Sequence, residues 1–127
     1  PPATFTGFLN QQQITQAYAA ADALVLPSDF GETWGLVVNE AMACGVPAVV
    51  SDAVGCGPDL VVPGRTGAVF PLGDVDRLAR ALHDVLAFDP AATGRFVSAQ
   101  IAHYAPTHTA EGVIEAAHRL CGRRLVR

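Results

Sequence analysis

The amino-acid sequence predicts an α/β domain in which helices cover both faces of a parallel sheet. Residues 23–28 and 47–52 are apolar almost throughout, which is typical of strands that are buried on both faces. Helical patterns separate these segments, as they do in doubly wound α/β folds. The chain has 127 residues, 50% of them hydrophobic, which is enough for one packed domain.

The N-terminal part is predicted to alternate strands with helices. Residues 3–9 alternate in polarity like a short strand, and residues 10–22 follow as a helix capped by Asn10. The apolar face of that helix is expected to hold Ile14, Ala17, Tyr18 and Ala21. After the strand 23–28, residues 34–45 are predicted to be a helix that ends at Gly45 and is followed by Pro47 and the strand 47–52.

The C-terminal part is predicted to be mainly helical. Residues 66–72 fit one more strand, and Pro58 with Asp59 fits the start of a helical turn. Helices are expected over three further segments, which are residues 74–88, 92–104 and 109–125, the last capped at Thr109.

The charges are distributed unevenly along the chain. Residues 1–64 carry six acids and no cation, and all eight basic residues are arginines from Arg65 onward. An acidic half of this kind is a poor nucleic-acid binder, so nucleic acid is not expected as a partner. The arginines at the C-terminal end, Arg119, Arg123, Arg124 and Arg127, are interpreted as a helix terminus, with docking on a membrane surface as a lesser alternative.

The cysteines and termini indicate where the protein is found. Cys44, Cys56 and Cys121 form no CxxC pair and are odd in number, which indicates reduced thiols in a cytoplasmic protein and no zinc site. Neither a membrane span nor a signal peptide is expected. The chain opens on Pro1 and Pro2 without methionine, so we expect it to be part of a longer protein.

The segment "DFGETWGLVVNEAMACG" carries the candidate site. It joins a strand to a helix, so it lies where parallel sheets gather ligands, at the carboxyl ends of the strands. The backbone N–H groups of Trp34, Gly35 and Leu36 start the helix and are expected to be free for a phosphate. Gly35 would allow close approach of a ligand.

Glu32 and Glu40 stand on either side of that helix start with no cation nearby. Ionised carboxylates only accept hydrogen bonds, and a vicinal diol offers two donors, so a diphosphate between two polyols would fit. The apolar neighbours are expected to cover most of the helix and to leave Glu40 little room as a solvated residue; they are Leu36, Val37, Val38, Ala41, Met42 and Ala43. The alternative is that both are surface acids, with Glu32 favouring the helix dipole.

The order of these residues resembles the C-terminal domain of the group 1 glycosyltransferases, also called glycosyltransferase family 4. The resemblance rests on Pro27-Ser28, Glu32, Trp34-Gly35-Leu36, Glu40-Ala41-Met42-Ala43, Gly45, Pro47, Gly64 and Thr66-Gly67. It covers Phe5 to about Leu86 well, and its main motif is the E-x7-E pair of Glu32 and Glu40. It implies a Rossmann-like domain, the C-terminal half of a GT-B enzyme.

The resemblance also implies roles for the site residues. Residues 1–127 would be part of the donor-binding domain of an enzyme that transfers a sugar from a nucleotide sugar to an unknown acceptor, with retention of configuration and without metal or cofactor. Glu32 would be the catalytic residue that contacts the transferred sugar. Sugar oxygens and the diphosphate would be bound by the backbone of Thr33, Trp34, Gly35 and Leu36. Glu40 would bind the ribose.

Parts that the family needs lie outside this sequence. The family's basic pair and its acceptor domain would precede Pro1, so the chain is expected to be inactive alone. A sheet that lacks strands has an open edge, so the chain is expected to self-associate. The alternatives are a nucleotide-binding or interaction module without transferase activity, and a GT-B sugar epimerase.

Other activities fit the sequence less well. Leu60 stands where a dinucleotide fingerprint needs glycine, which argues against a dehydrogenase. The histidines have no HExxH spacing and are expected at the surface, and neither Ser28 nor Ser51 lies in a GxSxG motif. The chain has no lysine, which a pyridoxal-dependent phosphorylase would need.

Overall fold

The computed structural model describes residues 3–121 and contains a three-stranded parallel sheet in the order β1-β2-β3. The strands are β1 (Leu24–Leu26), β2 (Ala48–Ser51) and β3 (Gly67–Phe70). Val25 pairs with Val49, and Val49 pairs in turn with Ala68. The predicted strands at 23–28, 47–52 and 66–72 are confirmed, and so is the parallel α/β class.

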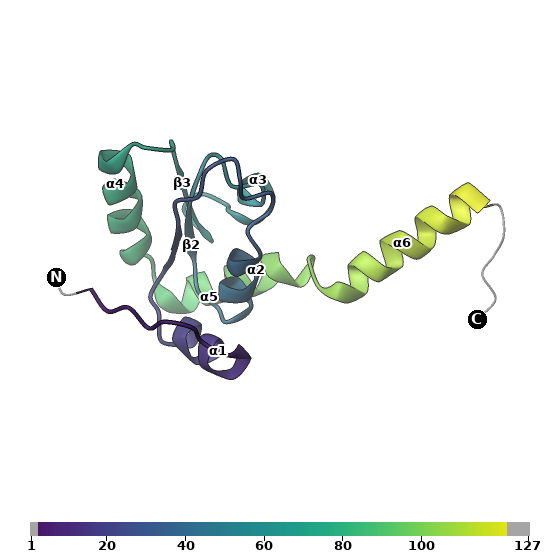
Figure 1. Cartoon of the computed structure of the whole chain (residues 1–127), viewed down its shortest axis with the longest axis horizontal. Helices are drawn as coiled ribbons and strands as arrows, with labels where there is room; N and C mark the ends of the chain where they lie inside the picture. The colour runs from purple at the N-terminus through teal and green to yellow at the C-terminus, as the bar shows by residue number, and fades with distance from the viewer. Residues whose placement is uncertain (1–2, 122–127) are drawn as a thin grey trace.

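The central strand shows why its sequence is apolar throughout. All four residues of β2 are buried, with Ala48 and Val50 in one core cluster and Val49 in another. The first cluster includes Val38 of α2 (Leu36–Ala43) and Val97 of α5 (Pro90–Ala102), and the second includes Val85 of α4 (Val75–Leu86). Figure 1 shows α4 on one side of the sheet and α2 with α5 on the other. Helices therefore cover both faces, as predicted.

Local capping signals explain where several helices begin. Asn10 caps α1 (Gln11–Ala19) in a capping box with Gln13, which confirms the predicted cap. Asp74 and Asp89 accept backbone hydrogen bonds at the starts of α4 and α5. The short helix α3 (Gly57–Leu60) contains Pro58 and Asp59, so the predicted helical turn is also confirmed.

The prediction of a strand at residues 3–9 is wrong. This segment pairs with no strand in the described part of the chain, and Phe5 and Phe8 are 95% and 94% exposed. Polarity alternation alone does not make a strand without a neighbour that supplies hydrogen bonds.

The predicted apolar face of α1 is half right, because Tyr18 is buried and Ile14 is partly buried, whereas Ala17 and Ala21 are exposed.

The last helix, α6 (Pro106–Cys121), begins three residues before the predicted cap Thr109. Proline at a first helical position costs no hydrogen bond, which favours the earlier start. None of the described residues of α6 is buried, and Figure 1 shows it projecting from the rest of the molecule. Arg119 pairs with Glu115 at 2.6 Å, while Arg123, Arg124 and Arg127 lie outside the described residues. Within residues 3–121 no helix is both long and apolar enough to span a bilayer.

Candidate functional site

The predicted loop lies at the carboxyl end of β1, where it connects that strand to α2. The hydroxyl of Ser51, the last residue of β2, donates a hydrogen bond to the carbonyl of Ser28 in this loop. Asp29 shapes the next turn, because its side chain accepts from the amide of Gly31 at 2.9 Å and its carbonyl from the amide of Glu32 at 3.1 Å. The loop is thus tied to the carboxyl end of β2 as well.

Two glycines fix the backbone that follows Glu32. Gly35 is buried with φ of 100°, and a Cβ atom there would lie 3.0 Å from Val54 and 3.1 Å from Leu26. Only glycine adopts such a conformation readily. Gly55 lets the loop pack closely against it, because any Cβ atom at this position would lie only 2.0 Å from the carbonyl oxygen of Thr33. The amide of Cys56 also donates to the carbonyl of Trp34 at 2.8 Å.

The helix start differs in detail from the prediction. Helix α2 begins at Leu36, with Gly35 at the cap position and no side chain capping it. Among the hydrogen bonds within residues 3–121, none uses the amides of Gly35, Leu36 or Val37. These groups, together with the helix dipole, favour an anion at this point. The expectation of a free amide at Trp34 is wrong, because this amide donates to Oε1 of Glu32 at 3.3 Å.

The two glutamates lie in different surroundings. Glu32 is half-buried, and its carboxylate folds back over the helix start to accept the Trp34 amide. Glu40 is exposed, and its Oε2 atom accepts a hydrogen bond of 3.0 Å from the hydroxyl of Tyr18. Neither carboxylate takes part in the ion pairs found among the described residues. Both carboxylates therefore lack an ion-pair partner within residues 3–121.

The expectation that apolar residues surround Glu40 is wrong. Val38, Ala41 and Met42 face the core, but Leu36 is 69% exposed and Ala43 is also exposed. One face of α2 is thus open, because α5 covers only part of the helix. A groove of about 650 Å³ lies between this face and the end of α5; its lining includes Leu36, Asn39, Glu40, Ala43, Ile101 and Tyr104.

Aromatic residues connect this groove to the loop. The Trp34 indole nitrogen donates to the side-chain oxygen of Asn39 at 2.7 Å, and its ring lies 6.0 Å from that of Tyr104. The Tyr104 hydroxyl donates in turn to a carboxylate oxygen of Asp59 at 3.3 Å. The side chain of Asp59 therefore faces Tyr104, just beyond the end of α5. Among the predicted site residues, Thr33 and Leu36 are both exposed.

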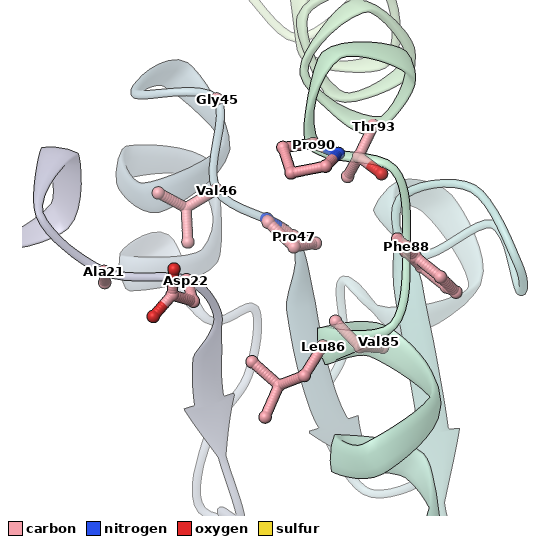
Figure 2. A pocket seen from close by; sticks show the side chains of 10 residues that line it. All are labelled: Ala21, Asp22, Gly45, Val46, Pro47, Val85, Leu86, Phe88, Pro90 and Thr93. Carbon is pink, nitrogen blue, oxygen red and sulfur yellow. The ribbon is translucent and has the colours of Figure 1, made fainter.

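A second cavity, of about 370 Å³, lies at the opposite edge of the sheet. Figure 2 shows Pro47 at its centre, directly before β2, with Asp22 on one side and Phe88 on the other. These positions precede the strands, whereas ligands of parallel sheets collect after them. Among the described residues that line it, Asp22 is the one ionisable group, so this cavity offers little chemistry compared with the loop.

Two groups that contact the candidate site are protonated, namely the thiol of Cys56 and the hydroxyl of Tyr18. Burial raises the pKa of the Cys56 thiol to about 11, and its sulfur lies 3.9 Å from the carbonyl oxygen of Gly35. Burial, and next the hydrogen bond to Glu40, raises the pKa of Tyr18 to about 12. Both groups keep their protons at neutral pH.

Within residues 3–121 no cluster of three or more His, Cys, Asp or Glu side chains is placed to hold a metal.

The geometry can be compared with known proteins. Residues 3–93 match the family model of the group 1 glycosyl transferases. Over 90 residues the chain is 46% identical to a sulfoquinovosyl transferase from Arabidopsis thaliana, covering 65% of this chain and 17% of that protein. It is 45% identical over 82 residues to a GDP-mannose-dependent alpha-mannosyltransferase from Mycolicibacterium smegmatis, covering 65% and 20%.

A solved structure extends the likeness to the fold. The sucrose-phosphate synthase from Thermosynechococcus elongatus superposes with a TM-score of 0.78 at 34% identity, over 94% of this chain and 30% of that one. The chain thus spans less than a third of each of these proteins. The match of the family model covers most of the chain and includes both glutamates. The chain belongs to the group 1 glycosyltransferases.

Proposed function

We propose that the chain forms part of the donor site of a retaining glycosyltransferase that uses a nucleotide sugar. The observation that carries this proposal is the helix start between Glu32 and Glu40, where the amides of Gly35, Leu36 and Val37 make no hydrogen bond within residues 3–121. A diphosphate suits such a group of donors, because it needs no cation to be recognised there. The GDP-mannose dependence of a relative supports a nucleotide-sugar donor.

Each carboxylate would hold a hydroxylated part of the donor. Glu32, as the catalytic residue, would contact the transferred sugar. The backbone of Thr33 to Leu36 would bind the oxygens of that sugar and the diphosphate. The Trp34 amide is engaged by Glu32, so the donor would gain this amide only as Glu32 turns toward the sugar. Glu40 is exposed on α2, where it would accept hydrogen bonds from the ribose diol.

Charge on the departing diphosphate would be stabilised in part from outside this chain. No cation occurs in residues 1–64, so backbone dipoles are the local source of positive potential, and the proposal needs neither metal nor cofactor. We therefore expect the 127 residues alone to catalyse no transfer. The proposal leaves the acceptor open. It includes a cytoplasmic location, self-association of the chain and peripheral membrane binding through the C-terminal arginines.

Ligand-induced stabilisation tests the donor role. The complete gene product that contains these residues would be melted with UDP-, GDP- and ADP-sugars, then again as Glu40→Ala. Saturation at 100 times the dissociation constant stabilises a protein by about 2.7 kcal/mol, so the correct donor should raise the melting temperature clearly. Glu40→Ala should lose most of that increase. Glu111→Ala, which removes an exposed helical glutamate on α6, is the matched control and should keep it.

The same experiment separates the alternatives. If a nucleotide sugar stabilises the protein but is neither transferred nor epimerised in activity assays, a nucleotide-binding module would be favoured. Epimerisation of the bound sugar would favour the sugar epimerase. Stabilisation by none of the donors would count against the proposal itself.

A further inference from the structure

Tyr18 is the partner of Glu40 in the folded chain, although 22 residues separate them. The two side chains come from α1 and α2, which pack together through a small cluster of Tyr18, Ala41 and Val46. Tyr18 is only 9% exposed, whereas Glu40 is exposed on the outer side of α2. A buried ring therefore presents its hydroxyl to a carboxylate at the surface.

This contact restricts an exposed side chain that takes part in no ion pair within residues 3–121. An exposed glutamate on a helix samples several rotamers, and fixing a long side chain of this kind opposes binding through lost entropy. The Tyr18 ring is held by packing against Ala41 and Val46, so its hydroxyl is a donor in a fixed place. Its raised pKa keeps the phenol protonated throughout the physiological range.

We propose that Tyr18 is a positioning residue that holds the Glu40 carboxylate ready to accept the two hydroxyls of a ribose. The inference rests on the proposed function, in which Glu40 binds the ribose. A carboxylate has about four acceptor positions, so the bond from Tyr18 to Oε2 leaves the others for a ligand. Tyr18 therefore contributes to the preference of the site for ribonucleotides without touching them.

The test compares ribonucleotides with nucleotides that lack the diol. The complete gene product is titrated with UDP, GDP and ADP, and the nucleotide that binds most tightly is compared with its 2′,3′-dideoxy form. The ratio of the two dissociation constants measures ribose recognition. Wild type should prefer the ribonucleotide by about tenfold or more, since hydrogen bonds to a charged group are the strong ones. Tyr18→Phe should reduce this ratio by about threefold or more.

The ratio distinguishes positioning from a structural effect. Damage to packing would weaken both nucleotides equally and leave the ratio unchanged, and Tyr18→Phe removes one hydroxyl from an intact ring. Thr15→Val removes a hydroxyl of the same helix α1 that donates to the carbonyl of Gln11 instead, so it is the matched control and should keep the ratio. In the double variant with Glu40→Gln, Tyr18→Phe should cause no further loss.

Two results would overturn the inference in distinguishable ways. If Glu40→Gln loses the preference and Tyr18→Phe keeps it, Glu40 binds ribose without help from Tyr18, and only the positioning role fails. If neither variant changes the preference, both the positioning role and the proposed ribose contact of Glu40 are wrong.

Discussion

The loop that carries Glu32 lies directly on Gly55, so Gly55→Ala should disturb the fold and the site together. The added Cβ atom would lie 2.0 Å from the carbonyl oxygen of Thr33, while real Cβ contacts essentially never fall below 3.0 Å. The two segments therefore have to separate by about 1 Å. Both are backbone, so no flexible side chain can absorb the change, and the hydrogen bond from the Cys56 amide to the Trp34 carbonyl, now 2.8 Å, is stretched with it.

The magnitude follows from these two contacts. Overpacking costs about 1–3 kcal/mol. Loss of a backbone hydrogen bond adds about 0.5–1.5 kcal/mol. We expect Gly55→Ala to lower the free energy of unfolding by about 1.5–4.5 kcal/mol, from the sum of the two effects. Since the loop holds the amides of Gly35 and Leu36, affinity for a nucleoside diphosphate should fall as well.

Urea unfolding of the chain, followed by circular dichroism, measures the first effect, and calorimetric titration of the complete gene product measures the second. Gly94→Ala is the matched control, because a Cβ atom at this helical position in α5 would meet nothing within 4 Å. It should stabilise the chain by about 0.4–1 kcal/mol. The reasoning is refuted if Gly55→Ala unfolds within about 0.5 kcal/mol of wild type, the range of an ordinary surface substitution.

Three further predictions follow from caps and protonation states. Asp89→Ala removes the carboxylate that accepts the Ala92 amide at 2.7 Å, and should cost about 1 kcal/mol in urea unfolding, with an unchanged value contradicting the capping role. In the native chain at pH 8, iodoacetamide should modify exposed Cys121 well before buried Cys56, and mass spectrometry showing equal rates would argue against a protonated thiol. The pKa of Tyr18 is about 12 in the fold against 10.0 as its ordinary value, so the unfolded chain releases this proton first, and stability should fall between about pH 10 and 12. Tyr18→Phe should flatten that fall in pH-dependent unfolding, and equal slopes would rule out the linkage.

Much of the fold could be predicted because its signals are local. A continuous apolar run identifies β2, and an aspartate three residues before a helical amide identifies the start of α4. The segment at 3–9 failed because a strand needs a partner, and alternation around Phe5 and Phe8 carries no information about pairing. Local signals therefore give the type of an element more reliably than its place in a sheet.

The site was predictable in part for the same reason. The spacing of Glu32 and Glu40 around a glycine is visible in the sequence, and the structure places Glu32 just before the start of α2 and Glu40 more than one turn inside that helix. The contact of Tyr18 with Glu40 depends on how α1 packs against α2, which no local pattern encodes. The open face of α2 depends likewise on how far α5 extends across it.

The hydrogen bond from the Trp34 amide to Glu32 bears on how a donor would bind. In the folded chain a carboxylate occupies one donor of the helix start, at the point that favours an anion most. A diphosphate arriving there would meet a negative charge before it met the full set of amides. The carboxylate would therefore have to turn away, and hydroxyls of the sugar would replace the amide it gives up. Glu32 would then favour a nucleotide sugar over a bare nucleoside diphosphate, which binds more weakly because only the sugar supplies the replacement donors. Donor recognition by this chain is thus expected to depend on sugar and phosphate together.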